Sequence, residues 1–212
     1  MNDDRSARKR RVVVDAATTL FLQHGYLGTS MDQIAAFAAV SKPTVYKFFP
    51  DKEQLLTAIV TETLEAASTP FLAELSELAE HTESSRLAGD LRELARRYLA
   101  TVTQPPVLQL RRLVIGASHQ LPGLARTYYE RAPEQTLRAL ADCFRRLADR
   151  GVLRVTDPGQ AAAHFAFLVL GRALDKSLFC GDQPFTQAEL AAQADAGASA
   201  FLAAYSAVGV MG

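Results

Sequence analysis

Residues 29–56 carry the side chains with the clearest chemistry, in the sequence T-S-M-D-Q-I-A-A-F-A-A-V-S-K-P-T-V-Y-K-F-F-P-D-K-E-Q-L-L. Two short helical patterns joined by a tight turn account for this stretch. The outward face of the later of these two helices is expected to carry Lys42, Pro43, Thr44, Tyr46 and Lys47. Cations, a phenol and small polar groups on one side of a short helix suit the major groove of DNA, where base edges and phosphates lie within reach. The pattern therefore predicts a helix-turn-helix.

Three helices must position this face. Apolar residues at helical spacing predict a first helix over about 7–24, and Gly25 ends it. Ser30 precedes Gln33 by three residues, which predicts a capping box at the start of a second helix. Ser41 is expected to cap the third helix, where Pro43 is tolerated because the first turn needs no intrahelical N–H donor at that position.

The remaining chain keeps a helical pattern to its end, with proline and glycine at the expected boundaries. Pro70 is expected to separate two helices, and no segment shows the alternation of a strand. The predicted fold class is all-α, with an N-terminal three-helix domain over residues 1–56 and a second helical domain over 57–212. The later helices are expected at about 51–67, 71–80, 84–103, 106–119, 122–131, 133–150, 158–180 and 186–208.

Composition and charge limit the classes of function that this chain can have. The chain has 212 residues, 49% of them hydrophobic, and a formal net charge of zero. Residues 1–52 hold eight Lys and Arg against five Asp and Glu, so a front end of charge +3 precedes a body of charge −3. The longest nearly unbroken apolar run, 161–171, is too short to cross a bilayer, so no membrane-spanning segment and no membrane partner are expected. With two cysteines and no leader-like start, a cytosolic protein is expected.

The chain lacks the motifs of enzymes and metal proteins. It contains no H-E-x-x-H, no C-x-x-C and no glycine-rich phosphate loop, and its four histidines fall in different elements. We therefore expect no enzymatic activity, no metal and no cofactor. An architectural DNA-coating protein is also disfavoured, because residues 53–212 are net acidic.

Four spaced motifs within about residues 10–59 resemble the N-terminal domain of the TetR/AcrR family of bacterial transcriptional regulators. They are A-A-x-x-L-F-x-x-x-G-Y at 16–26, T-S-x-x-x-I-A at 29–35, V-S-K-P-T-V-Y-x-F-F at 40–49 and D-K-E-x-L-L at 51–56. Many relatives have glycine where this chain has Ala39 and Pro43. The resemblance implies a homodimer that binds a two-fold-symmetric operator in double-stranded DNA, usually as a repressor, and releases it when a small molecule binds the C-terminal domain. An activator or a ligand-independent regulator of the same fold stays open.

The resemblance also implies roles for single residues. Lys42, Pro43 and Thr44 become the candidates for base contact, and Tyr46, Lys47 and Lys52 the candidates for phosphate contact. Ser30 and Met31 are expected to meet the DNA backbone through N–H groups at the start of the second helix. Asp32 would repel phosphate, so it is expected to turn away from DNA or to cap its own helix.

The C-terminal body is expected to hold the dimer contact and the effector. By resemblance the last two helices form the dimer contact; the alternative, less favoured here, is that their apolar stripe is an intramolecular core. Residues assigned to this contact are Gly171, Leu190, Ala194, Gly197, Phe201 and Tyr205. A small, apolar or aromatic effector is favoured by the supply of aromatic and aliphatic groups. Its candidate contacts are Leu110, Val114, His119, Tyr128, Phe144, His164, Phe167 and Leu168.

Overall fold

The computed structural model describes the backbone of residues 2–181 and 185–207, and the side chains from residue 5 onward within these ranges. Position 208, the predicted end of the last helix, lies outside the described residues. Within the described ranges the chain is all-α, as predicted, and its sole β contact is a single bridge between Leu153 and Ser206. The helices are α1 (Asn2–His24), α2 (Met31–Phe37), α3 (Lys42–Phe48), α4 (Lys52–His81), α5 (Leu87–Val102), α6 (Pro105–Ala117), α7 (Pro122–Tyr129), the π-helical turn η1 (Glu130–Glu134), α8 (Gln135–Asp149), α9 (Pro158–Phe179) and α10 (Gln187–Tyr205).

The chain forms two compact units that interleave along the sequence. The first unit comprises Met1–Leu64 and Gln109–Tyr129, and the second comprises Glu65–Leu108 and Glu130–Gly212. This grouping differs from a linear division at residue 56. The chain passes from one unit to the other inside α4, inside α6 and at the joint between α7 and η1.

The predicted helix break at Pro70 is wrong, because α4 continues through this residue to His81. A proline inside a helix removes one backbone hydrogen bond and crowds the preceding turn. Burial offsets that cost, since Phe71 and Leu75 on the following turn lie in the core of the second unit. The Phe71 ring stacks on Tyr98 of α5 with 5.1 Å between ring centroids.

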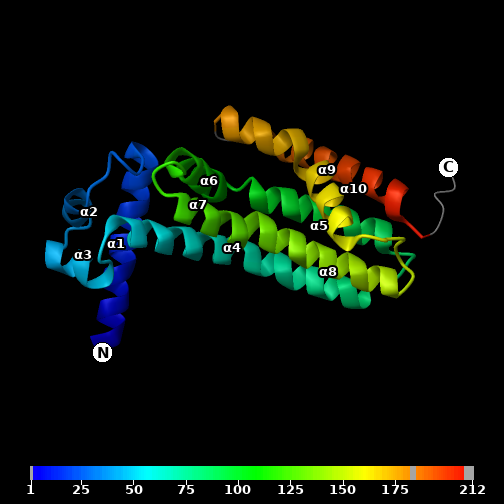
Figure 1. The fold of residues 1–212 in the computed structure, drawn as a ribbon, viewed down its shortest axis with the longest axis horizontal. Helices are drawn as coiled ribbons and strands as arrows, with labels where there is room; N and C mark the ends of the chain where they lie inside the picture. Colours follow the sequence, from blue (N-terminus) through cyan, green and yellow to red (C-terminus); the bar gives the residue numbers. More distant parts are fainter. Residues whose placement is uncertain (1, 182–184, 208–212) are drawn as a thin grey trace. The chain divides into compact units, whose positions relative to one another are not determined.

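An aromatic cluster forms the centre of the second unit. Phe144 of α8, Phe165 of α9 and Phe201 of α10 are all fully buried. Their ring centroids lie 5.5 Å (Phe144–Phe165), 4.8 Å (Phe144–Phe201) and 5.2 Å (Phe165–Phe201) apart. Figure 1 shows α10 running beside α9 and α5, against both of which it packs.

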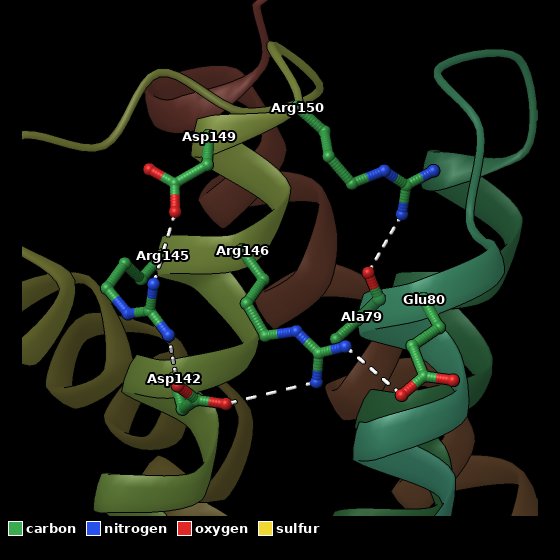
Figure 2. A network of polar contacts seen from close by, with 7 residues as sticks. All are labelled: Ala79, Glu80, Asp142, Arg145, Arg146, Asp149 and Arg150. Carbon is green, nitrogen blue, oxygen red and sulfur yellow. Dashed lines mark hydrogen bonds and ion pairs between the residues drawn. The ribbon is translucent and has the colours of Figure 1, made fainter.

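Polar contacts tie α8 to the end of α4 in the same unit (Figure 2). The guanidinium of Arg150 donates to the carbonyl oxygens of Ala79 at 2.8 Å and Thr82 at 2.9 Å. These are carbonyls at the C-terminal end of α4, where no intrahelical donor follows. One turn earlier, Arg146 bonds Glu80 at 3.1 Å. Arg150 thus caps a helix that is distant in sequence.

The small-residue stripe of α10, which the sequence assigned to a dimer contact, packs into the core of its own chain. Ala194 and Phe201 are fully buried within the second unit, and Gly197 is also buried. A Cβ atom added at Gly197 would lie 2.6 Å from the backbone oxygen of Leu168, so glycine lets α10 approach α9 closely. The alternative of an intramolecular stripe is the one that the packing supports.

The other three residues assigned to the dimer contact also face partners within the subunit. Gly171 breaks the helical geometry of α9, with φ 23° and ψ −126°, and faces the Gln193 side chain. The Tyr205 hydroxyl forms a 2.7 Å hydrogen bond with Nδ1 of His164. Leu190 is half-buried against the core at the start of α10.

Candidate nucleic-acid interface

The connection between α1 and α2 is fixed by local hydrogen bonds. Gly25 ends α1 with φ 71°, and the buried Thr29 hydroxyl lies 2.9 Å from the Gly25 carbonyl oxygen and 3.2 Å from that of Leu20. The predicted capping box is confirmed at the start of α2. There the Gln33 backbone N–H donates to Ser30 Oγ at 3.2 Å, and the Ser30 N–H donates to Gln33 Oε1 at 2.8 Å.

The turn between α2 and α3 contains Ala39 in the left-handed region, with φ 51°. The Ala39 N–H donates to the Ala36 carbonyl at 3.1 Å, and the next residue, Val40, donates to the Ala35 carbonyl at 3.1 Å. Both bonds satisfy carbonyls at the end of α2, so the turn keeps its geometry despite the Cβ atom of alanine.

Helix α3 presents the predicted face. Val45 is fully buried and Phe49, which follows the helix, is 5% exposed, so the inward side of α3 packs into the first unit. The Ser41 side chain does not cap the backbone; its Oγ lies 2.8 Å from Thr44 Oγ1 instead. The outward side consists of the exposed Lys42, Pro43, Tyr46 and Lys47 and the half-buried Thr44.

An ion pair that the sequence reasoning missed joins the two helices. Lys42 Nζ lies 2.6 Å from Asp32 Oδ2, with both side chains more than half exposed. Asp32 therefore neither turns away from the face nor caps its helix, since Gln33 completes the capping box. The ten-residue separation gives no helical periodicity from which this pair could have been inferred.

Lys52 has partners of its own inside the first unit. Its ammonium donates to the carbonyl oxygens of Tyr26 and Thr29, at 2.7 Å each, and lies 4.2 Å from the centroid of the Tyr26 ring. Partial burial lowers the pKa of Lys52 from its ordinary value. Two of the three N–H groups are thus committed to the α1–α2 connection, which limits what Lys52 can offer to a phosphate.

The start of α2 and the basic N-terminal part of α1 carry further residues that were considered for DNA contact. Ser30 is exposed, whereas the Met31 side chain is 9% exposed and packs inward, so only the backbone of Met31 is available at the helix start. Arg8, Lys9 and Arg11 are exposed on α1. Arg10 differs from them, because it pairs with Glu62 and lies 5.2 Å from the Phe49 ring centroid.

The eight residues predicted to contact an effector are divided between the two units. In the first unit, Leu110, Val114 and Tyr128 are buried and His119 is exposed. Arg111 Nε donates to the Tyr128 hydroxyl at 3.0 Å. In the second unit, Phe144 fills the aromatic cluster and His164 bonds Tyr205. Phe167 is 74% exposed and Leu168 is 41% exposed, both on the outside of α9. The described structure therefore does not support the prediction that these two side chains line a cavity.

Other chemistry finds little support in the described residues. Among them no three His, Cys, Asp or Glu side chains gather in a way that could hold a metal ion. Cys143 is buried and desolvation raises the pKa of its thiol to about 12, while Cys180 is exposed. Over the same ranges, no helix combines the length and apolar character needed to cross a membrane.

The exposed face of α3, held by a buried inner side and preceded by a capped helix and a tight turn, defines a helix-turn-helix DNA-binding protein. Residues 13–59 match the family model described as bacterial regulatory proteins of the tetR family. Residues 89–207 match the model described as the AefR-like transcriptional repressor, C-terminal domain. The chain belongs to the TetR family of transcriptional regulators.

Known relatives agree with this assignment. A putative TetR-family regulator from Mesorhizobium loti MAFF303099 is 39% identical with a TM-score of 0.86, over 95% of this chain and 98% of that one. The flavonoid-responsive regulator FrrA is 34% identical with a TM-score of 0.72, over 94% of this chain and 98% of its own. The uncharacterized regulator YhgD of Bacillus subtilis is 42% identical over 59 residues, which are 28% of this chain. That match spans about a third (31%) of the YhgD protein.

Proposed function

We propose that this regulator is a repressor that binds a palindromic operator as a homodimer and releases it when a small effector binds. The observation that carries the proposal is the outward face of α3, where Lys42, Pro43, Tyr46 and Lys47 are exposed beside the half-buried Thr44 while Val45 anchors the helix from behind. Such a helix can enter the major groove only as a rigid element. The capping box of α2 and the carbonyl contacts of Lys52 supply that rigidity.

The exposed groups divide by chemistry. Lys42, Pro43 and Thr44 occupy the first turn of α3 and suit base edges, the lysine for guanine acceptors and the other two for a thymine methyl. Tyr46 and Lys47 lie further along and suit phosphate oxygens. We assign Lys52 a positioning role first, because its ammonium already binds two backbone carbonyls.

Selection of bound fragments from genomic DNA, followed by anisotropy titration over a range of salt concentrations, tests DNA binding. Lys47→Ala should weaken binding to all fragments and reduce the slope of log K against log salt by about one unit. Arg138→Ala is the matched control, because Arg138 is an exposed cation on α8 in the second unit. Equal effects of the two substitutions, or no fragment retained at low salt, would remove the assignment. Reporter expression with and without the regulator then separates a repressor from an activator.

The ion pair between Lys42 and Asp32 allows a second test, which asks whether Lys42 lies at the DNA. Asp32→Ala should strengthen binding to unrelated DNA and steepen the salt slope by about one unit, because it frees a cation and removes an anion. Adding Lys42→Ala to the Asp32→Ala protein should remove that gain, because the freed cation is lost. If Asp32→Ala changes neither the affinity nor the salt slope, the pair does not restrict Lys42 at the interface.

Dimerisation is supported by apolar groups left exposed on the last two helices. Phe167 is 74% and Phe179 86% exposed on α9, and the side of α10 opposite its core stripe is also exposed and small. Rings this exposed are candidates for burial against a second copy of the chain. Residues on the exposed side of α10 are Ala192, Ala196, Ser199, Ala200 and Ala203.

Light scattering of two variants distinguishes this surface from the core stripe. Phe167→Glu should halve the mass while the far-UV circular dichroism stays native. Gly197→Glu should instead unfold the second unit, because even a Cβ atom there collides with the α9 backbone. A Phe167→Glu protein of unchanged mass would move the dimer contact elsewhere.

The effector is proposed to be small and apolar or aromatic. FrrA, named as flavonoid-responsive, shares 34% identity over nearly the whole chain, which supports an uncharged aromatic effector here. A ligand that binds the DNA-free conformer better by about 1–3 kcal/mol lowers operator affinity about 5–150-fold. Loss of anisotropy of a bound operator on adding such compounds tests release.

A further inference from the structure

A pocket of about 260 Å³ lies in the second unit, outside the set of residues that the sequence suggested for an effector. It is formed where α5 ends and α6 begins, against the end of α9 and the start of α10. None of the eight predicted effector contacts lines it. Its walls are Ala100, Thr103, Gln104, Pro105, Leu108, Ser177, Phe185, Thr186, Gln187 and Leu190.

No lining side chain of this pocket is charged. Two charged side chains beside the lining residues have partners of their own: the Lys176 ammonium lies over the Phe185 ring at 4.7 Å, and the Glu189 carboxylate accepts from the Thr186 N–H at 2.7 Å and from its hydroxyl at 2.9 Å. A carboxylate or ammonium would therefore find no countercharge among the lining side chains and would lose part of its hydration on binding, whereas an uncharged ligand loses less. The lining therefore selects an uncharged ligand.

Two amide side chains at the pocket can bond that ligand. Throughout the described residues, neither the Gln104 nor the Gln187 side chain has a hydrogen-bond partner, and each can donate and accept. The Thr103 hydroxyl donates to the Leu99 carbonyl at 2.7 Å and keeps its acceptor capacity. Leu108, Phe185 and Leu190 supply apolar walls. A ligand with a ring and a hydroxyl or carbonyl group matches both parts of the lining.

We propose that this pocket binds a small, neutral, single-ring compound with a phenol or ester group. Its volume is below the roughly 300–1,000 Å³ of pockets that take drug-sized ligands, which favours one ring. Gln104, Pro105 and Leu108 line the pocket at the start of α6, and from Gln109 onward α6 belongs to the first unit. The role of this pocket as an effector site rests on the proposed function. In that role, the continuous helix α6 links the ligand to the DNA-binding unit.

Methyl 4-hydroxybenzoate and its free acid form a matched pair of probes, one neutral and one anionic at neutral pH. Isothermal titration of the full-length protein without DNA should detect the ester, with the anion at least tenfold weaker. Ala100→Phe should abolish ester binding by filling the pocket, and Gln104→Leu should weaken it. The control is Ala73→Phe, which places the same ring on an exposed position of α4 in the same unit and should leave binding unchanged.

Two readouts separate this proposal from the proposed function. No ester binding, equal binding of the anion, or full binding by Ala100→Phe would overturn the pocket assignment, whatever the DNA result. Ester binding that Ala100→Phe removes, with an operator complex unaffected by the ester, would support the pocket and overturn its role as an effector site. Release of operator by the ester from wild type, but not from Ala100→Phe, is the expected result.

Discussion

Replacing Ala39 with glycine should stabilise the protein. Ala39 has φ 51°, a conformation that costs an L-residue about 1–2 kcal/mol relative to glycine. Glycine offsets about 0.4–1 kcal/mol of this gain, because it increases the conformational entropy of the unfolded chain. The Ala39 side chain is exposed and its N–H bond to Ala36 involves only backbone, so no packing is lost. The expected gain in the free energy of unfolding is about 0.5–1 kcal/mol.

Urea and thermal unfolding followed by far-UV circular dichroism measure this gain. A rise in the midpoint of about 1–4 °C is expected for a chain of this size. The matched control is Ala36→Gly, at an exposed position inside α2, which should lower stability by about 1 kcal/mol because its backbone is helical. If Ala39→Gly lowers stability as much as Ala36→Gly does, the turn is not strained and the reasoning fails.

Three further perturbations test other contacts. Lys52→Met should lower the free energy of unfolding by about 1–2 kcal/mol in urea titrations, because two carbonyls lose their donor; an unchanged midpoint would mean that water replaces it fully. In thiol titration of the native protein, Cys180 should react quickly and Cys143 only after unfolding. The free energy of unfolding should also fall as pH rises from 9.0 toward about 12, because over this range the Cys143 thiol ionises in the unfolded chain but stays neutral in the folded protein. Arg150→Ala should cost about 1–2 kcal/mol through its capping bonds, whereas the exposed ion pairs of Arg145 should contribute nothing measurable.

The N-terminal helices could be predicted because their signals are local. The capping box at Ser30, the glycine at position 25 and the proline in the first turn of α3 each act within four residues, and all three predictions are confirmed. The orientation of α3 followed from its short apolar side. The contacts of Lys52 and Asp32 could not be predicted, because their partners lie ten or more residues away in sequence.

The C-terminal helices show what periodicity leaves open. An apolar stripe indicates that one side of a helix is buried, but it does not say whether the covering surface belongs to the same chain or to another. The stripe of α10 through Gly197 and Phe201 is buried by α9 and α5 of its own subunit. Pro70 shows a related limit, because the tertiary burial of Phe71 outweighs a local signal for a helix end.

The interleaving of the two units along the chain has a consequence for proteolysis. Each passage between the units, within α4, within α6 and between Tyr129 and Glu130, occurs in helical backbone. Proteases cut extended, exposed segments readily and helices poorly. Limited digestion should therefore not release the DNA-binding unit as a stable fragment, and a truncation that removes the segment after Leu108 would also strip the DNA-binding unit of residues 109–129.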